Sequence, residues 1–193
     1  MGTRGACGFR KNNIDKITYN HSNSDPEHLG DAVVQFCRFT PIENLHRIFD
    51  LIQLVDPLDL PTEKQVSECR VWMHTGPWVP GQSNWHDLLH KAQDGLIAYR
   101  KLRYMVDYAG FLQHSLHCEY AYIVNLDTCE LEFWEGFQLQ PTQGNRYGMQ
   151  PDDSGYYPCR LVMVFPLRDI PHNAAKLMSD GRSKYEPYTD SVF

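Results

Sequence analysis

The sequence contains no hydrophobic run long enough to cross a membrane. Its longest apolar stretches, such as residues 161–165, are far shorter than the roughly 18 consecutive apolar residues that a membrane-spanning helix needs. The N-terminal segment also lacks the apolar core of a secretory signal peptide. We therefore expect a cytoplasmic protein with no membrane partner.

Paired cysteines are also missing. The chain has six cysteines, and no two of them stand in a C-x-x-C arrangement. A chain of 193 residues can bury a core and does not depend on disulfides for its stability. A disulfide framework is therefore excluded. We expect reduced thiols at all six positions, which are Cys7, Cys37, Cys69, Cys118, Cys129 and Cys159.

An excess of positive charge is absent too. The formal net charge is -6, which argues against a broad phosphate-binding surface and therefore against nucleic acid as a partner. Residues 99–104 and the first sixteen residues are locally basic, but one short basic turn is not the continuous stripe that follows a nucleic-acid backbone. We interpret residues 99–104 as a solvated helix face.

The common catalytic and nucleotide-binding motifs are missing as well. The chain contains no G-x-S-x-G, no Walker loop and no G-x-G-x-x-G. These absences remove the most specific sequence signatures for a serine hydrolase or a nucleotide-binding enzyme. We expect no cofactor.

Length and composition predict one folded domain over residues 1–193, with a polar tail from about residue 180. The chain is long enough for one sizeable core and too short for two ordinary domains. Its 42% hydrophobic and 22% charged residues are typical of a globular protein rather than a disordered one. The order of the expected elements predicts an α+β domain, in which helices pack on an antiparallel sheet of two hairpins and a central strand.

The N-terminal third predicts a hairpin followed by two helices. Residues 3–20 contain two strand-like runs around Lys11-Asn12-Asn13, and asparagine tolerates the positive φ of a tight turn. Asp25-Pro26 supplies an N-cap and a first-turn proline for a helix, and a second helix begins after Pro41. Residues 56–83 are rich in proline, and we expect a long ordered loop with one short helix at residues 62–69.

The rest of the chain predicts a long helix, a second hairpin, a buried strand and a short final helix. Residues 85–106 carry an apolar stripe at helical spacing that includes Leu96. Residues 119–137 alternate with a period of two around Asp127-Thr128, with Glu130 and Glu132 on the outward side. The run RLVMVF lacks polar alternation, as expected of a central strand covered on both faces, and a short helix follows near residues 173–178.

Two histidine pairs are possible metal ligands. Residues 84–90, NWHDLLH, nearly spell the zinc-hydrolase motif H-E-x-x-H, but Asp87 replaces the glutamate and the spacing shows no third ligand. The alternative is an exposed helix start with Asn84 as its N-cap, which we favour. His114 and His117 form a second pair, and H-x-x-H occurs often by chance. We expect no bound metal.

The N-terminus suggests another kind of chemistry. Removal of Met1 would leave a free amine at the start of a strand, which is the arrangement of N-terminal-nucleophile hydrolases. Gly2 carries no nucleophile, so Thr3 or Cys7 could act only after further processing. Ala6 stands where a myristoylation motif has serine or threonine, which argues against that modification.

The junction between the first hairpin and its helix is the preferred binding site. Polar side chains gather over residues 19–25, where a strand end meets a helix start. Pairing across Asn12-Asn13 places Arg4 near His21. We therefore predict a ligand-binding site formed by Arg4, Tyr19, His21 and Asp25, although the segment could also be only a capping network.

Three segments resemble an uncharacterised family of small bacteriophage and bacterial proteins. They are MGTRG followed by GFR and DKITYNH, then DPEHLG, and later FLQHSLHCEYAYIVNLDTCELEFWEGF. Members of this family begin M-G-T-R and carry a C-E-Y-A-Y-I-x-N-L-D hairpin. This chain differs at the junction, where Asn23 and Asp25 replace the acid and the aromatic residue before the proline. The resemblance implies a phage or mobile-element setting, and it supplies no established activity.

Two hypotheses of function follow. The first is a phage accessory protein in the host cytoplasm that binds a host protein or a small polar or anionic ligand, and so inhibits a host defence system. It rests on the resemblance, on the absence of a complete catalytic signature and on an acidic, aromatic-rich hairpin suited to contact. The alternative is a small hydrolase, either N-terminal-nucleophile-like or dependent on a histidine-bound metal.

Overall fold

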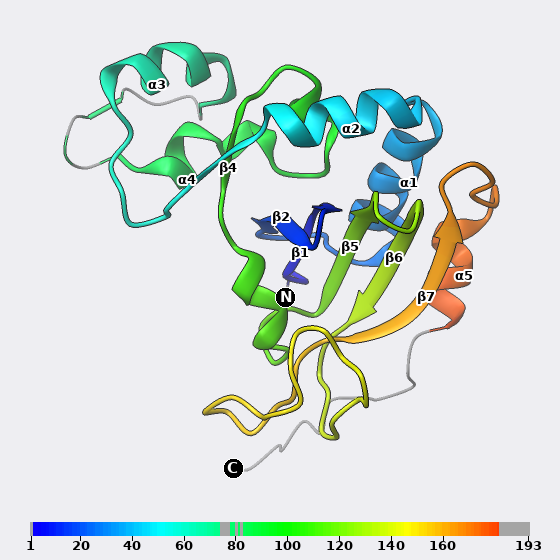
Figure 1. The fold of residues 1–193 in the computed structure, drawn as a ribbon. Coiled ribbons are helices and arrows are strands. Elements are labelled where there is room, and N and C mark those ends of the chain that lie inside the picture. Colours follow the sequence, from blue (N-terminus) through cyan, green and yellow to red (C-terminus); the bar gives the residue numbers. More distant parts are fainter. Residues whose placement is uncertain (1, 74–77, 80, 82, 182–193) are drawn as a thin grey trace.

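A five-stranded sheet with the order β2-β1-β5-β6-β7 forms the centre of the protein (Figure 1). The computed structural model describes residues 2–73, 78–79, 81 and 83–181. A second, two-stranded sheet pairs β3 with β4. The strands are β1 (Gly5–Lys11), β2 (Ile14–Asn20), β3 (Gln53–Val55), β4 (Tyr104–Val106), β5 (Tyr120–Asn125), β6 (Glu130–Glu135) and β7 (Arg160–Pro166).

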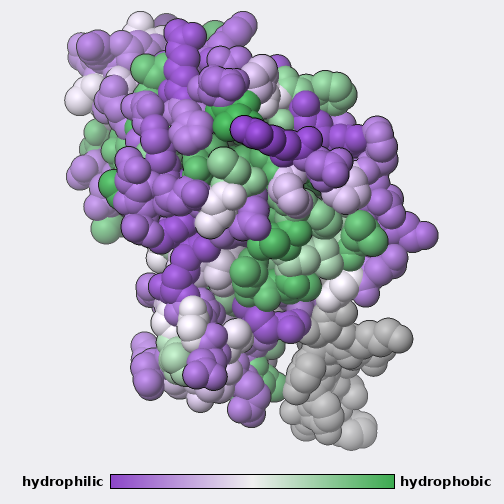
Figure 2. Space-filling view, turned by 45° about the vertical axis from the view of Figure 1, so that its right-hand side comes forward, coloured by the Kyte–Doolittle hydropathy of each residue, from purple (hydrophilic) through white to green (hydrophobic). Residues whose placement is uncertain are grey.

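The predicted α+β class is confirmed, and two features of the sheet differ from expectation. The sheet is mixed, because β1 runs parallel to β5 while the other neighbours are antiparallel. The predicted central strand RLVMVF is β7, which lies at the edge of the sheet. Leu161 and Val164 remain about 40% exposed, and hydrophobic residues gather on the side of the molecule that carries β7 (Figure 2). An apolar run without alternation therefore did not require burial on both faces.

The first hairpin forms as predicted, and a residue of the second hairpin hydrogen-bonds to the turn of the first. Asn12 and Asn13 have φ angles of 53° and 60°, the left-handed conformation that a two-residue turn between twisted strands favours. The carboxylate of Asp127, in the turn between β5 and β6, accepts hydrogen bonds from the N–H groups of Asn12 and Asn13 at 2.7 and 2.9 Å. Both hairpin turns therefore meet at one end of the sheet.

Four of the described α-helices and a π-helical turn form near the positions predicted for helices. Asp25 caps the π-helical turn η1 with Pro26 in its first turn, and Pro41 precedes the second helix. Thr62 caps the short helix of the 56–83 loop, of which residues 74–77, 80 and 82 lie outside the described part. The helices are η1 (Pro26–Gly30), α1 (Asp31–Arg38), α2 (Ile42–Leu51), α3 (Glu63–Cys69) and α5 (Ala174–Asp180).

The predicted long helix over residues 85–106 is wrong. Only Trp85–Leu88 is α-helical (α4), and 3-10 turns at His90–Ala92 and Ile97–Arg100 are followed by β4. Asp94 and Gly95 separate these turns with φ angles of 69° and 128°, which a continuing right-handed helix does not allow. The stripe residues are nevertheless buried, and Leu96 has no exposed surface. The apolar spacing therefore predicted correctly which residues are buried, but the continuous helix that it predicted does not form.

The two faces of the main sheet are covered differently. One face, with Phe9, Tyr122 and Phe133, packs against the apolar sides of the helices in the larger core. Gly30 lets η1 approach the sheet, because a Cβ there would lie only 2.9 Å from the ring of Tyr122. The other face, including Trp134, is covered by the loop over residues 138–159 and the turn Ala109–Gln113 (η5). Among the described helices, none has the length and apolar character to cross a membrane.

Candidate functional site

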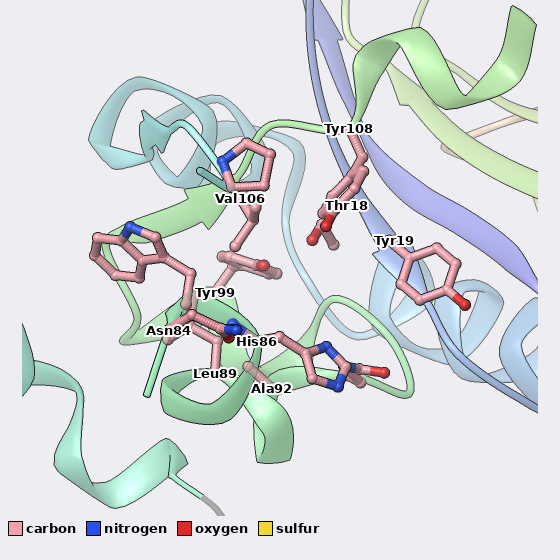
Figure 3. Close-up of a pocket in the computed structure, with 12 residues that line it drawn as sticks. Thr18, Tyr19, Asn84, His86, Leu89, Ala92, Tyr99, Val106 and Tyr108 are labelled. Atoms are coloured by element: carbon pink, nitrogen blue, oxygen red, sulfur yellow. The ribbon is translucent and has the colours of Figure 1, made fainter. Parts of the chain in front are cut away.

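A partly enclosed cavity lies between the end of β2 and α4. It has a volume of about 110 Å³, which is of the same order as the roughly 150 Å³ of an engineered cavity that binds benzene. Figure 3 shows Thr18, Tyr19 and Tyr108 on one side and Asn84, His86, Leu89 and Ala92 on the other. Tyr99, Val106, Pro57, Trp85 and Gln93 complete the lining.

The start of α4 positions the helical side of the cavity. Asn84 Oδ1 accepts hydrogen bonds from the N–H groups of His86 and Asp87 at 2.9 and 3.2 Å, and Asp87 Oδ2 accepts from the N–H of Asn84 at 3.0 Å. This reciprocal capping box fixes the first turn and confirms the interpretation of NWHDLLH as a capped helix start. His86 is exposed at the cavity, whereas Leu88 and Leu89 are buried.

A third histidine lies beside His86 of α4 and His90 of the 3-10 turn that follows it. The ring centroids of His86 and His90 are 5.9 Å apart, and those of His21 and His86 are 6.4 Å apart. His21 follows β2 and could not be joined to this pair by sequence spacing. Within the described residues, no group of three His, Cys, Asp or Glu side chains has the arrangement needed to hold a metal ion. We call His21, His86 and His90 the histidine row.

Gln93 connects the strand end to α4. Its Oε1 accepts a hydrogen bond from the N–H of His21 at 3.2 Å, and its Nε2 lies 3.4 Å from Nδ1 of His86. The adjacent Asp94 N–H donates to Oδ1 of Asn20, the last residue of β2, at 2.9 Å. The 93–94 segment therefore holds His21 and His86 in a defined relation, although they are far apart in sequence.

Aromatic rings form the strand side of the cavity. The ring of Tyr19 lies 5.7 Å from that of Tyr108 and 5.3 Å from that of Phe111. Its hydroxyl is 3.1 Å from Nδ1 of His21. Tyr19 therefore links the apolar cluster to the histidine row. Such a surface offers a ligand both a flat apolar contact and a hydrogen-bonding edge.

Burial shifts the pKa values of the titratable groups around the cavity. It lowers the pKa of His86, with a further contribution in the same direction from His90. Burial raises the pKa of Tyr19, although the charge of Arg4 opposes this shift, and it raises the pKa of the buried Tyr99 phenol strongly. The cavity therefore presents neutral phenols and an imidazole that is mainly neutral near pH 7.

The structure brings together part of the predicted site. Tyr19 lines the cavity, and His21 lies against both Tyr19 and His86. Arg4 acts on Tyr19 through its charge, and its backbone N–H donates to Oε1 of Glu119 at 3.0 Å. Asp25 serves as a helix cap, where it accepts from the N–H of Glu27 and contacts Nδ1 of His28 at 2.8 Å. The capping interpretation therefore accounts for the described partners of Asp25.

The reactive groups that the hydrolase alternative requires are engaged elsewhere. Cys7 is 1% exposed within β1, and burial raises the pKa of its thiol to about 12, so the thiolate that would act as nucleophile is scarce. Thr3 Oγ1 accepts a hydrogen bond from the N–H of Ser24 at 2.8 Å. His114 contacts Asp152 at 3.1 Å rather than completing the histidine row.

A second polar cluster lies on the opposite side of the sheet from α1 and α2. Glu132, expected to face outward, is only 3% exposed. Its carboxylate accepts hydrogen bonds from both terminal nitrogens of Arg146 at 2.8 and 2.5 Å, from Asn125 at 2.7 Å and from the Trp134 indole at 2.9 Å. The prediction failed because strand alternation does not show that the 138–159 loop covers this face. We call Glu132, Arg146, Asn125 and Trp134 the Glu132 cluster.

A second, wider depression lies between η1 and α5. Its volume is about 460 Å³, and Glu27, Asp31, His172, Lys176 and Asp180 are among the residues that line it. Both acidic and basic side chains line it, and the depression is open to solvent. It offers neither the aromatic wall nor the enclosure of the cavity at α4.

The sequence did not identify several residues of the cavity lining as part of a site. Gln93, Tyr99 and Tyr108 come from segments that were assigned to one long helix or to its following connection. Only a prediction of the tertiary fold could have placed them beside Tyr19. Comparisons with models of known protein families, with curated protein sequences and with solved structures found no match.

Proposed function

We propose that this protein binds a small ligand that contains a planar ring, in the cavity between β2 and α4. The observation that carries the proposal is the partly enclosed, ring-sized cavity with aromatic rings on one side and polar groups at its edge. Ligand sites in proteins commonly combine apolar walls with a few well-placed polar groups. A space that only reflected imperfect core packing would not need hydroxyl, amide and imidazole groups around it.

Binding is better supported than catalysis. Tyr19, Tyr99 and His86 could donate or accept hydrogen bonds, but a nucleophile activated by a neighbouring base is not formed by the cavity residues described. The phenol pKa values of Tyr19 and Tyr99 are raised, so neither group is a ready base. The phage setting and the inhibition of a host defence system stay predictions from the sequence resemblance.

The proposal is tested by titrating the protein with benzamide, a neutral planar ring with one polar group. We expect saturable binding in isothermal titration calorimetry. Substitution of Ala92, a buried residue of the cavity lining, by leucine should fill the space and weaken binding by about tenfold or more, because the ring loses many small packing contacts at once.

The matched control is Ala175→Leu, which adds the same side chain to the partly buried surface of α5. This variant should bind benzamide as the parent protein does. Denaturant unfolding of Ala92→Leu checks that the fold survives the larger side chain. Absence of benzamide binding in the parent protein, or equal binding by Ala92→Leu in its folded state, contradicts the proposal.

A further inference from the structure

We propose that the ligand carries an anionic group next to its ring, and that the histidine row binds this group at the edge of the cavity. This inference rests on the proposed function, because it places the ring of the ligand in the cavity. Three imidazoles in succession are costly to protonate together, since like charges at about 6 Å repel. An anion bound beside them would remove that cost.

The hydrogen bonds of Gln93 determine which nitrogen of His86 carries the proton. Gln93 Oε1 is used by the N–H of His21, so the amide must present its N–H₂ group to Nδ1 of His86. An N–H donor makes Nδ1 an acceptor, and the neutral imidazole then carries its proton on Nε2. His86 therefore keeps an N–H donor on Nε2 even when it is uncharged.

Tyr19 can impose the same tautomer on His21. The pKa of Tyr19 is raised, so its hydroxyl keeps its proton and can donate to Nδ1 of His21 at 3.1 Å. His21 then also carries its proton on Nε2. Two imidazoles from different parts of the chain thus become N–H donors through partners that both border the cavity. An anionic oxygen is the acceptor that such paired donors bind most strongly.

The charges around His86 are compatible with an anion. His90 and His21 both lower its pKa, and Asp87, on the same helix, raises it. The Asp87 carboxylate is held by the N–H of Asn84 in the capping box. On the strand side, Arg4 adds a positive charge near Tyr19. Protonation of His86 would therefore be driven mainly by the ligand, and binding should strengthen as pH falls.

Benzoate and benzamide provide a matched pair of probes, because they share one shape and differ in charge. A carboxylic acid of ordinary pKa, about 4, stays ionised at pH 5.5. We expect the parent protein at pH 5.5 to bind benzoate about tenfold more tightly than benzamide, as one charge-assisted hydrogen bond provides. At pH 8 this preference should shrink, because His86, whose pKa is lowered, then acts only as a neutral donor.

The variant His21→Gln/His86→Gln should lose the preference for benzoate, so that the ratio of its benzoate and benzamide affinities at pH 5.5 falls to about one. The control His46→Gln replaces a histidine on α2, which affects Asp127 at the hairpin-turn end of the sheet, and it should keep the preference. In NMR titrations, benzoate should raise the pKa of His86 in the parent protein, whereas benzamide should not.

The outcomes separate the two proposals. If benzamide binds and benzoate binds no more tightly at pH 5.5, the anion site is wrong while the ring-binding cavity stands. If the benzoate preference is present and survives in His21→Gln/His86→Gln, the histidine row is not its source and the inference is also overturned. If neither probe binds, the cavity is not a site for such rings, and both proposals fail.

Discussion

The Glu132 cluster and the histidine row are both polar, but their hydrogen bonding differs. Glu132 is buried, and its carboxylate receives four hydrogen bonds from three side chains. Burial raises the pKa of Glu132, but the hydrogen bonds and charge of Arg146, with the other donors, outweigh burial and lower it. His21 and His86 are exposed and make single, longer contacts to Tyr19 and Gln93.

The difference indicates what each cluster does. The Glu132 carboxylate is buried, and both of its oxygens accept hydrogen bonds from side chains of the cluster. It therefore holds the 138–159 loop on the sheet and has no lone pair left for a ligand. Imidazoles held in place by one ring nitrogen keep the other nitrogen for a further partner. The first arrangement is typical of structural anchoring, and the second of a site prepared for binding.

The largest expected effect is on the Glu132 cluster. Arg146→Met should lower the free energy of unfolding by about 3–5 kcal/mol, because it leaves the Glu132 carboxylate buried without its cation. Lys64→Met is the control, since Lys64 and Glu68 form an exposed pair on α3, and it should cost about 1 kcal/mol or less. Chemical denaturation measures both. Equal costs would mean that the cluster does not anchor the loop.

Leu96 tests whether the core extends beneath the cavity. It is completely buried among apolar residues, so Leu96→Ala should cost roughly 2–4 kcal/mol through lost contacts and the space left behind. The neighbouring Ile97 is 56% exposed, and Ile97→Ala should cost less than about 0.5 kcal/mol. Denaturant unfolding that gave both variants the same stability would contradict the described packing.

Two helix caps distinguish stability from binding. Asn84→Ala and Thr62→Ala each remove a capping box and should each cost about 1 kcal/mol in thermal or chemical unfolding. Only Asn84→Ala should also weaken benzamide binding, because α4 carries His86 and Leu89 into the cavity. Similar benzamide affinities for the two variants would show that the start of α4 is not part of the site.

The smallest expected change in stability belongs to the predicted site itself. Arg4→Ala/His21→Ala should change the free energy of unfolding by less than about 0.5 kcal/mol, as is usual for exposed side chains, while greatly weakening benzoate binding. The exposed pair Arg38 and His172 supplies the control, Arg38→Ala/His172→Ala, which should keep benzoate binding. Loss of binding only together with loss of the fold would make the junction structural.

Local patterns in the sequence predicted much of the fold. The turn at Asn12-Asn13, the caps at Asp25 and Asn84, and the second hairpin all depend on neighbouring residues, and the structure confirms them. The long helix failed at Asp94-Gly95, where backbone conformation overrode the apolar spacing. The edge position of β7 depends on which strands pair, and strand pairing is not encoded in the alternation of one segment.

The cavity was predictable only on its strand side. Tyr19 and His21 could be selected because they stand together at a strand end. His86 was considered separately as a metal ligand, and nothing in the spacing joins residue 21 to residue 86. Their contact depends on the 93–94 segment, where Gln93 binds His21 and Asp94 binds Asn20. Long-range hydrogen bonds of this kind follow from the tertiary fold.

The central claim, that the cavity between β2 and α4 binds a planar ring, is tested most directly by locating benzamide on the protein. Titration of ¹⁵N-labelled protein in two-dimensional NMR should produce saturable shifts in the backbone amides of Thr18, Tyr19, Leu89 and Gln93. Amides of α5, at the open depression, should stay unchanged. Saturable shifts confined to α5, or no shifts at any concentration up to the solubility of benzamide, would contradict the claim.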